Sequence, residues 1–184
     1  MAGYFDHAED NLTLARFQAF DFERMDKPEV LEPMLFYILH RANSTIYDPV
    51  QHQTPKLVVF DEAWRFFRNP VTRAYIHEAL KTWRKRNAAM ILATQSGDDL
   101  LRSELLPTIA ESCMTRIFLA NPGMDAAAYR EAFNLNSVEA ALIGRLIPKQ
   151  QFLLKRPDGA KVLNLFVDPD SFRIFSNTAG GNTQ

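Results

Sequence analysis

A chain of 184 residues and 21.1 kDa is long enough to bury about 70% of the surface that its unfolded form would expose, so we expect one domain with a real core. Its 47% hydrophobic and 23% charged residues, with seven glycines, exclude disordered and collagen-like classes. The 21 Lys and Arg residues nearly balance the 22 Asp and Glu residues, so a nucleic-acid contact would need a local basic patch.

The single cysteine, Cys113, excludes an intramolecular disulfide and a cysteine cluster for zinc, which is typical of a reducing compartment. Residues 1–11 carry acids and a histidine where a secretory signal has basic residues and an apolar run. The sequence contains no run of 18 apolar residues. We therefore expect a cytosolic chain without a membrane-spanning segment, and we assign no role to Cys113 or to the four histidines, which lack metal-ligand spacing.

Strand-like and helix-like patterns alternate along the chain. Apolar runs predict strands over residues 16–22, 56–60, 90–94 and 116–120, of which 56–60 has the near-continuous apolar character of a strand buried on both faces. Periodicity and capping signals predict helices from Pro28 past Leu39, from Pro70 to Trp83 with Asn69 as N-cap, around 100–112, and over 125–133 and 137–146. We also expect a polar loop over 43–55, a hairpin of 152–155 with 162–167, and a frayed tail after Phe175.

This order of elements predicts an α/β fold, because strands separated by helices form βαβ units. We expect one mostly parallel sheet with helices on both faces and the antiparallel hairpin at one edge. Ligands bind such sheets beyond the carboxyl ends of the strands. Polar residues that follow three of the predicted strands should therefore meet along one crevice: Asp61, Glu62, Gln95 and Asn121.

Asp61 and Glu62 have two interpretations. In a nucleoside triphosphatase the first carboxylate can hold Mg²⁺, which prefers oxygen ligands, and the second can orient or deprotonate the attacking water. In a structural interpretation, Asp61 caps the following helix and Glu62 lies in its first turn, where the helix dipole favours an anion. The acid pair alone favours neither interpretation.

Gln95 follows the next predicted strand, where a neutral amide can contact a γ-phosphate or the attacking water without adding charge. Taken alone, residues 94–96 are better explained as a polar exit from the strand. Two polar strand ends in one predicted crevice carry more weight than either one separately.

A basic cluster ends the helix that begins at Pro70: Lys81, Arg84, Lys85 and Arg86. Cations at this end of a helix complement its dipole by about 0.3–1 kcal/mol each, which explains the charge completely. In the alternative, one arginine reaches into a neighbouring subunit and stabilises a transferring phosphoryl group, an effect of about 10³–10⁵ in rate. The charge alone favours the first explanation.

Three stretches in this order resemble the C-terminal part of the VirB/TrbE-type ATPases of conjugative and type IV secretion systems: LVVFDEAWRFF, KTWRKRNAAMILATQS and TRIFLANPGMDAAAYREAFNLN. The resemblance extends upstream to FDHAEDNLTLARFQAFDFERM and so covers nearly the whole chain. It implies a partial RecA-like P-loop NTPase core over residues 1–175, related to FtsK and HerA translocases. It also implies ATP and Mg²⁺ as cofactors, a homo-oligomer that is hexameric in the full-length family, and peripheral association with the cytoplasmic face of the inner membrane.

By position, the resemblance makes Asp61 and Glu62 the Walker B pair, with Asp61 binding Mg²⁺ directly or through water. It makes Gln95 the glutamine that senses the γ-phosphate and also takes part in catalysis. Arg84, eleven residues before this glutamine, takes the place of the trans-acting arginine. The proposed catalytic residues are therefore Glu62, Gln95 and Arg84.

The sequence departs from the family at the phosphate-binding loop, because none of its seven glycines is followed by lysine as G-x-x-x-x-G-K-[ST] requires. We therefore expect that this chain alone neither binds ATP tightly nor hydrolyses it. The leading hypothesis is a fragment of a motor that moves pilin, protein or DNA with other secretion components. The alternatives are a catalytically silent assembly module of the secretion apparatus and a fragment of an FtsK/HerA-type DNA translocase.

Overall fold

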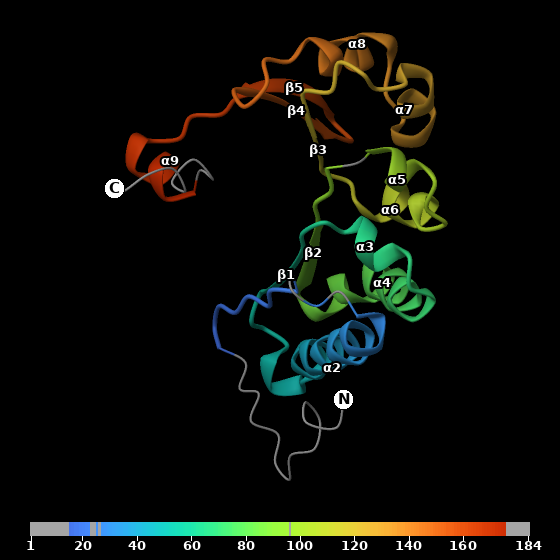
Figure 1. The fold of residues 1–184 in the computed structure, drawn as a ribbon, viewed down its shortest axis with the longest axis vertical. Coiled ribbons are helices and arrows are strands. Elements are labelled where there is room, and N and C mark those ends of the chain that lie inside the picture. The colour runs from blue at the N-terminus through green and yellow to red at the C-terminus, as the bar shows by residue number, and fades with distance from the viewer. Residues whose placement is uncertain (1–14, 23–24, 26, 96, 176–184) are drawn as a thin grey trace. The chain divides into compact units, whose positions relative to one another are not determined.

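The structure is a computed structural model that describes residues 15–22, 25, 27–95 and 97–175. The chain divides into two compact units. The first unit comprises Met1–Val58 and Thr82–Ala89, and the second comprises Val59–Lys81 and Met90–Gln184. Figure 1 labels the elements of both units.

The long helix of the first unit is α2 (Pro28–Tyr47), which begins at the predicted proline. Leu35, Ile38 and Leu39 of the predicted apolar stripe are buried. The expected loop over residues 43–55 is wrong for its first residues, since the helix continues to Tyr47. Buried Ile46 stabilises this last turn, which the polar residues around it conceal in the sequence.

A short polar and aromatic cluster holds the basic turn of the first unit. The turn is the 3₁₀ helix η2 (Trp83–Arg86), and a second 3₁₀ helix, η1 (Pro49–Gln51), follows α2. The Tyr47 hydroxyl lies 2.8 Å from the Thr82 hydroxyl, and the Arg86 guanidinium lies 4.9 Å from the centre of the Tyr47 ring. Because Trp83 is buried as well, the backbone of this turn is anchored.

Strands β1 (Lys56–Phe60) and β2 (Ala88–Leu92) form a two-stranded sheet. The Lys56 N–H donates to the Asn87 carbonyl and the Ala93 N–H donates to the Phe60 carbonyl, so the strands run parallel, as predicted. Leu57 and Val59 are exposed, so the expectation that this strand is buried on both faces is wrong. Burial on both sides requires a packed layer over each face, and the described chain supplies only one.

The helices that follow β1 and β2 belong mainly to the second unit. They are α3 (Trp64–Phe67), α4 (Pro70–Thr82), α5 (Gly97–Leu101) and α6 (Leu106–Ser112). Asn69 caps α4 as predicted, because its Oδ1 accepts hydrogen bonds from the backbone N–H groups of Val71 and Thr72 at 2.9 and 3.1 Å. The weak helical pattern over residues 100–112 corresponds to two short helices instead of one.

A three-stranded antiparallel sheet consists of β3 (Arg116–Leu119), β4 (Gln151–Arg156) and β5 (Gly159–Asn164). The predicted hairpin is confirmed, with Pro157 and Asp158 between its strands and Gly159 at φ 149°, which favours glycine. The expectation that residues 116–120 extend the parallel sheet is wrong, because β3 pairs with β4. The hairpin strand offers β3 an apolar partner in register, and antiparallel pairing is slightly more stable per residue.

One face of this sheet packs against α7 (Ala126–Phe133) and α8 (Ser137–Arg145), which are the predicted helical pair and lie beside the sheet in Figure 1. Asp125 caps α7, and Asn136 with Glu139 forms a capping box on α8. The core between these elements consists of Tyr129, Phe133, Leu135, Ile143, Leu146 and Leu153, with Phe118 packed against it.

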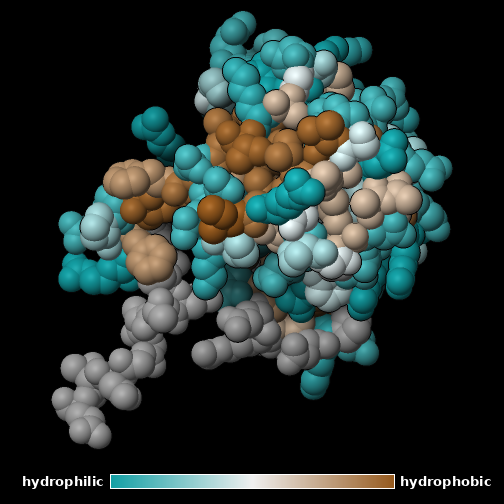
Figure 2. All heavy atoms as spheres, turned by 90° about the horizontal axis from the view of Figure 1, so that it is seen from above, coloured by the Kyte–Doolittle hydropathy of each residue, from teal (hydrophilic) through white to brown (hydrophobic). Residues whose placement is uncertain are grey.

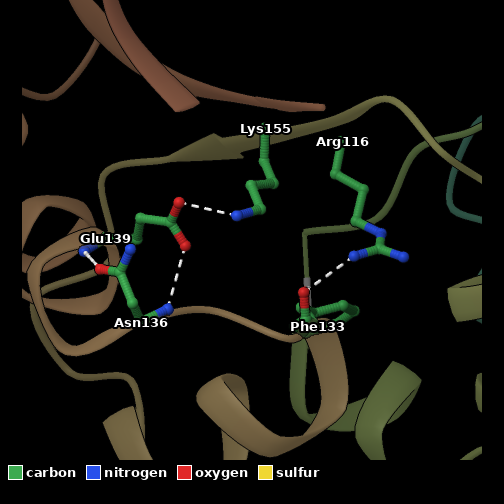
Figure 3. A network of polar contacts seen from close by, with 5 residues as sticks. All are labelled: Arg116, Phe133, Asn136, Glu139 and Lys155. Carbon is green, nitrogen blue, oxygen red and sulfur yellow. Dashed lines mark hydrogen bonds and ion pairs between the residues drawn. The ribbon is translucent and has the colours of Figure 1, made fainter. Parts of the chain in front are cut away.

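Polar contacts connect the same helices to the sheet (Figure 3). The Lys155 ammonium of β4 donates to buried Glu139 of α8 at 2.7 Å. The Arg116 guanidinium of β3 donates to the Phe133 carbonyl at the end of α7 at 2.8 Å and to the Cys113 carbonyl at 3.1 Å. These contacts fix both helices on the sheet.

Residues 16–22 are not a strand, so that prediction is wrong. A strand requires a neighbour to complete its hydrogen bonds, and the described residues provide none for this segment. After β5 the chain continues to α9 (Pro169–Phe175), and the tail predicted to fray lies outside the described residues. In the described ranges, no helix combines the length and apolar character needed to cross a membrane.

Candidate functional site

The candidate site lies where β1 and β2 end. Asp61, Glu62 and Ala63 form a turn between β1 and α3, and the Ala63 N–H donates to the Ala93 carbonyl just beyond β2 at 2.8 Å. Oδ1 of Asp61 accepts the Glu62 N–H at 2.9 Å. The N-cap of α3 is Ala63, without a side-chain hydrogen bond, so the alternative in which Asp61 caps that helix does not hold.

Glu62 has an unusual backbone conformation and two side-chain partners. Its φ of 49° lies in the left-handed region, which non-glycine residues adopt at a cost of about 1–2 kcal/mol. Oε1 accepts a hydrogen bond from the Gln95 side-chain amide, and Oε2 accepts the Trp64 indole N–H at 2.6 Å. The structure therefore brings the predicted glutamate and glutamine into direct contact.

Trp64 is a site residue that sequence reasoning missed. Its ring lies under the Arg68 guanidinium, 4.5 Å from the ring centre, while its N–H engages Glu62. The available signal was an aromatic N–H donor two residues after the acid pair. Trp64 and Arg68 also line a shallow groove with Phe67, Arg73, Asp99, Arg102, Ser103 and Glu104, in which Arg73 pairs with Glu104 at 3.2 Å.

Asn121 has different surroundings from the other predicted strand-end residues. Its side-chain amide lies 3.4 Å from the Tyr129 hydroxyl, and the described contacts do not join it to Glu62 or Gln95. Gly97, two residues after Gln95, lies directly against that hydroxyl: a Cβ built at Gly97 would be 1.7 Å from it. Burial raises the pKa of Tyr129, the Asn121 contact lowers it, and the charge of Asp98 raises it. The Gln95 loop therefore packs on Tyr129, and Asn121 touches that tyrosine instead of the acid pair.

Arg84 is an exposed residue of η2 in the first unit, whereas Glu62 and Gln95 belong to the second unit. Its backbone carbonyl accepts the Asn87 N–H, and Asn87 ends the turn in the left-handed conformation at φ 52°. This geometry leaves the guanidinium directed by an anchored turn. The role of Arg84 stays a prediction.

The donor set at the strand ends suits a magnesium nucleotide. Asp61 is exposed and offers a carboxylate, and Mg²⁺ is commonly held by one or two carboxylates together with waters and phosphate oxygens. The described residues include no cluster of three or more His, Cys, Asp or Glu that would hold a metal by protein ligands alone. Cys113 does not belong to this site. Burial raises its pKa, the Arg116 charge opposes that effect, and the thiol is correspondingly unreactive.

Paired strand ends of this kind occur in nucleotide-dependent motors, and residues 10–119 match the AAA-like domain family, so the chain belongs to that family. Within it, the chain is 34% identical over 92% of its length to a probable conjugal transfer protein TrbE of Sinorhizobium fredii. It is also 34% identical over 92% of its length to the conjugal transfer protein TrbE of Rhizobium radiobacter. The type IV secretion system protein VirB4 of Bartonella quintana is 33% identical over 95% of this chain.

The fold also matches a solved structure, VirB4 of Thermoanaerobacter pseudethanolicus. The TM-score is 0.64 at 19% identity, and the match covers 82% of this chain and 41% of that chain. The predicted α/β fold and the resemblance to TrbE and VirB4 ATPases are therefore confirmed. The chain spans 26%, 21% and 22% of the three relatives named above, which is about a quarter of their length.

Proposed function

We propose that this chain is the part of a type IV secretion or conjugal transfer ATPase that carries its Walker B acids, its sensor glutamine and its trans-acting arginine. The observation that carries the proposal is the direct contact between Glu62 and Gln95 at the ends of two adjacent parallel strands. This is the edge of a parallel sheet at which ligands bind.

Each residue has a chemical role in this proposal. Asp61 holds Mg²⁺ directly or through water, and the ion, when bound, neutralises charge on the nucleotide phosphates. Glu62 accepts a proton from the water that attacks the γ-phosphorus, and the bond from that phosphorus to the β,γ-bridging oxygen breaks, which leaves ADP and phosphate. Gln95 contacts the γ-phosphate or that water, and Arg84 of one subunit stabilises the transition state in its neighbour.

The contacts of Glu62 define a resting arrangement for this site. Both carboxylate oxygens accept hydrogen bonds, one from Gln95 and one from Trp64. Accepting a proton from water requires Glu62 to exchange at least one of these partners. The natural exchange is at Gln95, whose amide then becomes free to contact the γ-phosphate. The Trp64 hydrogen bond continues to orient the carboxylate.

The phosphate-binding loop must come from elsewhere, because the sequence contains no Gly-Lys pair. We therefore propose that the chain is inactive by itself and works with the remaining portion of a TrbE/VirB4-type protein. The active form is a homo-oligomer at the cytoplasmic face of the inner membrane, and its hydrolysis drives pilus assembly or the transfer of DNA or protein. Relatives named as conjugal transfer and type IV secretion proteins support this role.

The test is phosphate release by this chain mixed with the preceding portion of the Rhizobium radiobacter TrbE protein, which supplies the family's phosphate-binding region. We expect turnover only in the mixture, and its loss with Glu62→Gln. Arg84→Ala should lower the rate about 10³–10⁵-fold, whereas Lys85→Ala, the matched loss of a cation from the same turn, should not. Hydrolysis by the pure chain that disappears in Glu62→Gln would overturn the proposed division of labour.

One observation favours a second candidate, a catalytically silent assembly module: the missing Gly-Lys pair. In that case the mixture binds together without nucleotide turnover, and Glu62→Gln changes nothing measurable. Stimulation of the reconstituted activity by DNA would instead identify a translocase of the FtsK/HerA kind.

A further inference from the structure

The three-stranded sheet has two apolar faces, of which α7 and α8 cover one. Side chains alternate along a strand, and the register pairs Phe118 with Leu153 and Leu153 with Val162, which places these three residues on the covered side. The opposite side carries Ile117, Leu119, Phe152, Leu154 and Leu163, followed by Leu165 just after β5. We call these six residues the open face.

The open face is exposed in the chain as it stands. Ile117 is 61% exposed, Leu119 is 70% exposed and Leu165 is 53% exposed, whereas Leu153 on the covered side is fully buried. Figure 2 views the molecule from the end of Figure 1 at which α8, β4 and β5 lie, and it shows hydrophobic residues gathered on that surface. Contiguous apolar patches of this kind mark sites of protein interaction.

The chemistry of the open face specifies its partner. The two complete cross-strand rows are Ile117–Leu154–Lys161 and Leu119–Phe152–Leu163. Four of these residues are aliphatic and one is aromatic, while Lys161 introduces a positive charge at the outer strand. The complementary surface is therefore apolar, with an acidic group near its margin.

The lengths of the relatives point to one occupant. Each of the named relatives is about four times as long as the region it shares with this chain, and the solved VirB4 chain extends far beyond its match as well. A second copy of this chain would have to present the same Lys161 to itself across a twofold interface, which places like charges together.

We propose that the open face docks the portion of a TrbE/VirB4-type ATPase that lies outside the shared region. This inference rests on the function proposed above and adds the surface through which the two portions join. Docking covers the exposed side of the sheet, so the sheet becomes an inner layer between α7–α8 and the partner. The interface does not involve the acid pair or Gln95.

The experiment measures binding of this chain to the immobilised preceding portion of the Rhizobium radiobacter TrbE protein, without nucleotide. Leu119→Lys places a charge at the centre of the open face and should weaken binding at least 10-fold. Val138→Lys is the matched control, because Val138 is an apolar residue of α8 that is 65% exposed on another surface. Circular dichroism and the urea midpoint of unfolding establish that both variants are folded.

The outcomes separate this proposal from the proposed function. Glu62→Gln should bind as well as the unaltered chain, so intact binding without ATP hydrolysis would contradict the proposed function and leave the docking surface standing. Absence of binding, or equal weakening by Leu119→Lys and Val138→Lys, would overturn the docking surface. Dimerisation of the chain through Leu119 in sedimentation, without binding to the TrbE portion, would overturn it as well.

Discussion

The turn that carries Asp61 and Glu62 and the C-terminal sheet with α7 and α8 both use ionisable side chains, but in opposite ways. In the sheet region Glu139 is buried, completes a helix cap and pairs with Lys155 at 2.7 Å. In the turn, Glu62 adopts a left-handed backbone conformation, and its carboxylate contacts the exposed amide of Gln95. The first arrangement uses charge to fix a structure, and the second keeps polar groups accessible at an energetic cost.

This difference teaches that a hydrogen-bonded carboxylate is not by itself a sign of catalysis. What distinguishes Glu62 is the combination of backbone strain, access to solvent and a position at the end of a parallel strand. Glu139 has more complete hydrogen bonding but neither strain nor access. Four substitutions test whether the two regions differ in this way.

Leu153→Ala should have the largest effect, because Leu153 is fully buried in the core of the sheet region. We expect a loss of about 2–5 kcal/mol in the free energy of unfolding. Leu119→Ala, the same change on the open face of the sheet, should cost less than about 1 kcal/mol in the chain alone. Urea unfolding followed by far-ultraviolet circular dichroism measures both, and equal losses would contradict the assignment of the two faces.

Glu139→Gln should produce a pH-dependent loss. Burial raises the pKa of Glu139, but hydrogen bonds from Lys155 and the Asn136 backbone, with the Lys155 charge, outweigh burial and leave that pKa below its ordinary value. A carboxyl with a lowered folded-state pKa stabilises the fold above its unfolded pKa, and this stabilisation disappears as pH falls through the folded pKa.

At pH 7 we expect the Gln variant to lose about 1–3 kcal/mol. The difference from the unaltered chain should shrink as pH falls from about 5 towards 3. Urea unfolding at a series of pH values measures this trend. A difference that stays constant with pH would show that the ion pair does not stabilise the region.

Gly97→Ala tests how tightly the Gln95 loop packs on Tyr129. The added methyl group would overlap the buried tyrosine, so we expect a loss of about 1–3 kcal/mol. Gly144→Ala in α8 is the matched control, since its Cβ would enter open space, and it should stabilise the chain by about 0.5–1 kcal/mol. Thermal unfolding compares the two variants, and a neutral Gly97→Ala would mean that the loop moves freely away from Tyr129.

Trp64→Phe should have the smallest effect, because it removes one hydrogen bond to Glu62 from a half-buried position. We expect a loss of about 0.5–1.5 kcal/mol by urea unfolding. A loss well above that range would assign Trp64 to the core instead of to the site.

Much of the fold was predictable because its signals are local. The cap at Asn69, the turn before Gly159 and the apolar run of residues 56–60 each specify a conformation within a few residues. The errors concern strand pairing, which depends on partners distant in sequence: residues 16–22 lack a neighbouring strand, and residues 116–119 pair with the hairpin instead of β2.

The candidate site divides in the same way. The meeting of Glu62 and Gln95 follows from the general geometry of parallel strands, so the sequence was sufficient to anticipate it. The Trp64 hydrogen bond depends on the left-handed backbone of Glu62, and the sequence contains no sign of this conformation because a glutamate rarely adopts it. The position of Asn121 depended on the incorrect pairing of β3.

The open face also bears on how a cell would handle this polypeptide. Exposed apolar strands attract chaperones and proteases, and they promote aggregation when the concentration of the chain rises. A newly made copy that has not met its counterpart would therefore be held or degraded, whereas an assembled copy would persist. Abundance of the two portions would then be matched by turnover, without any need for equal synthesis.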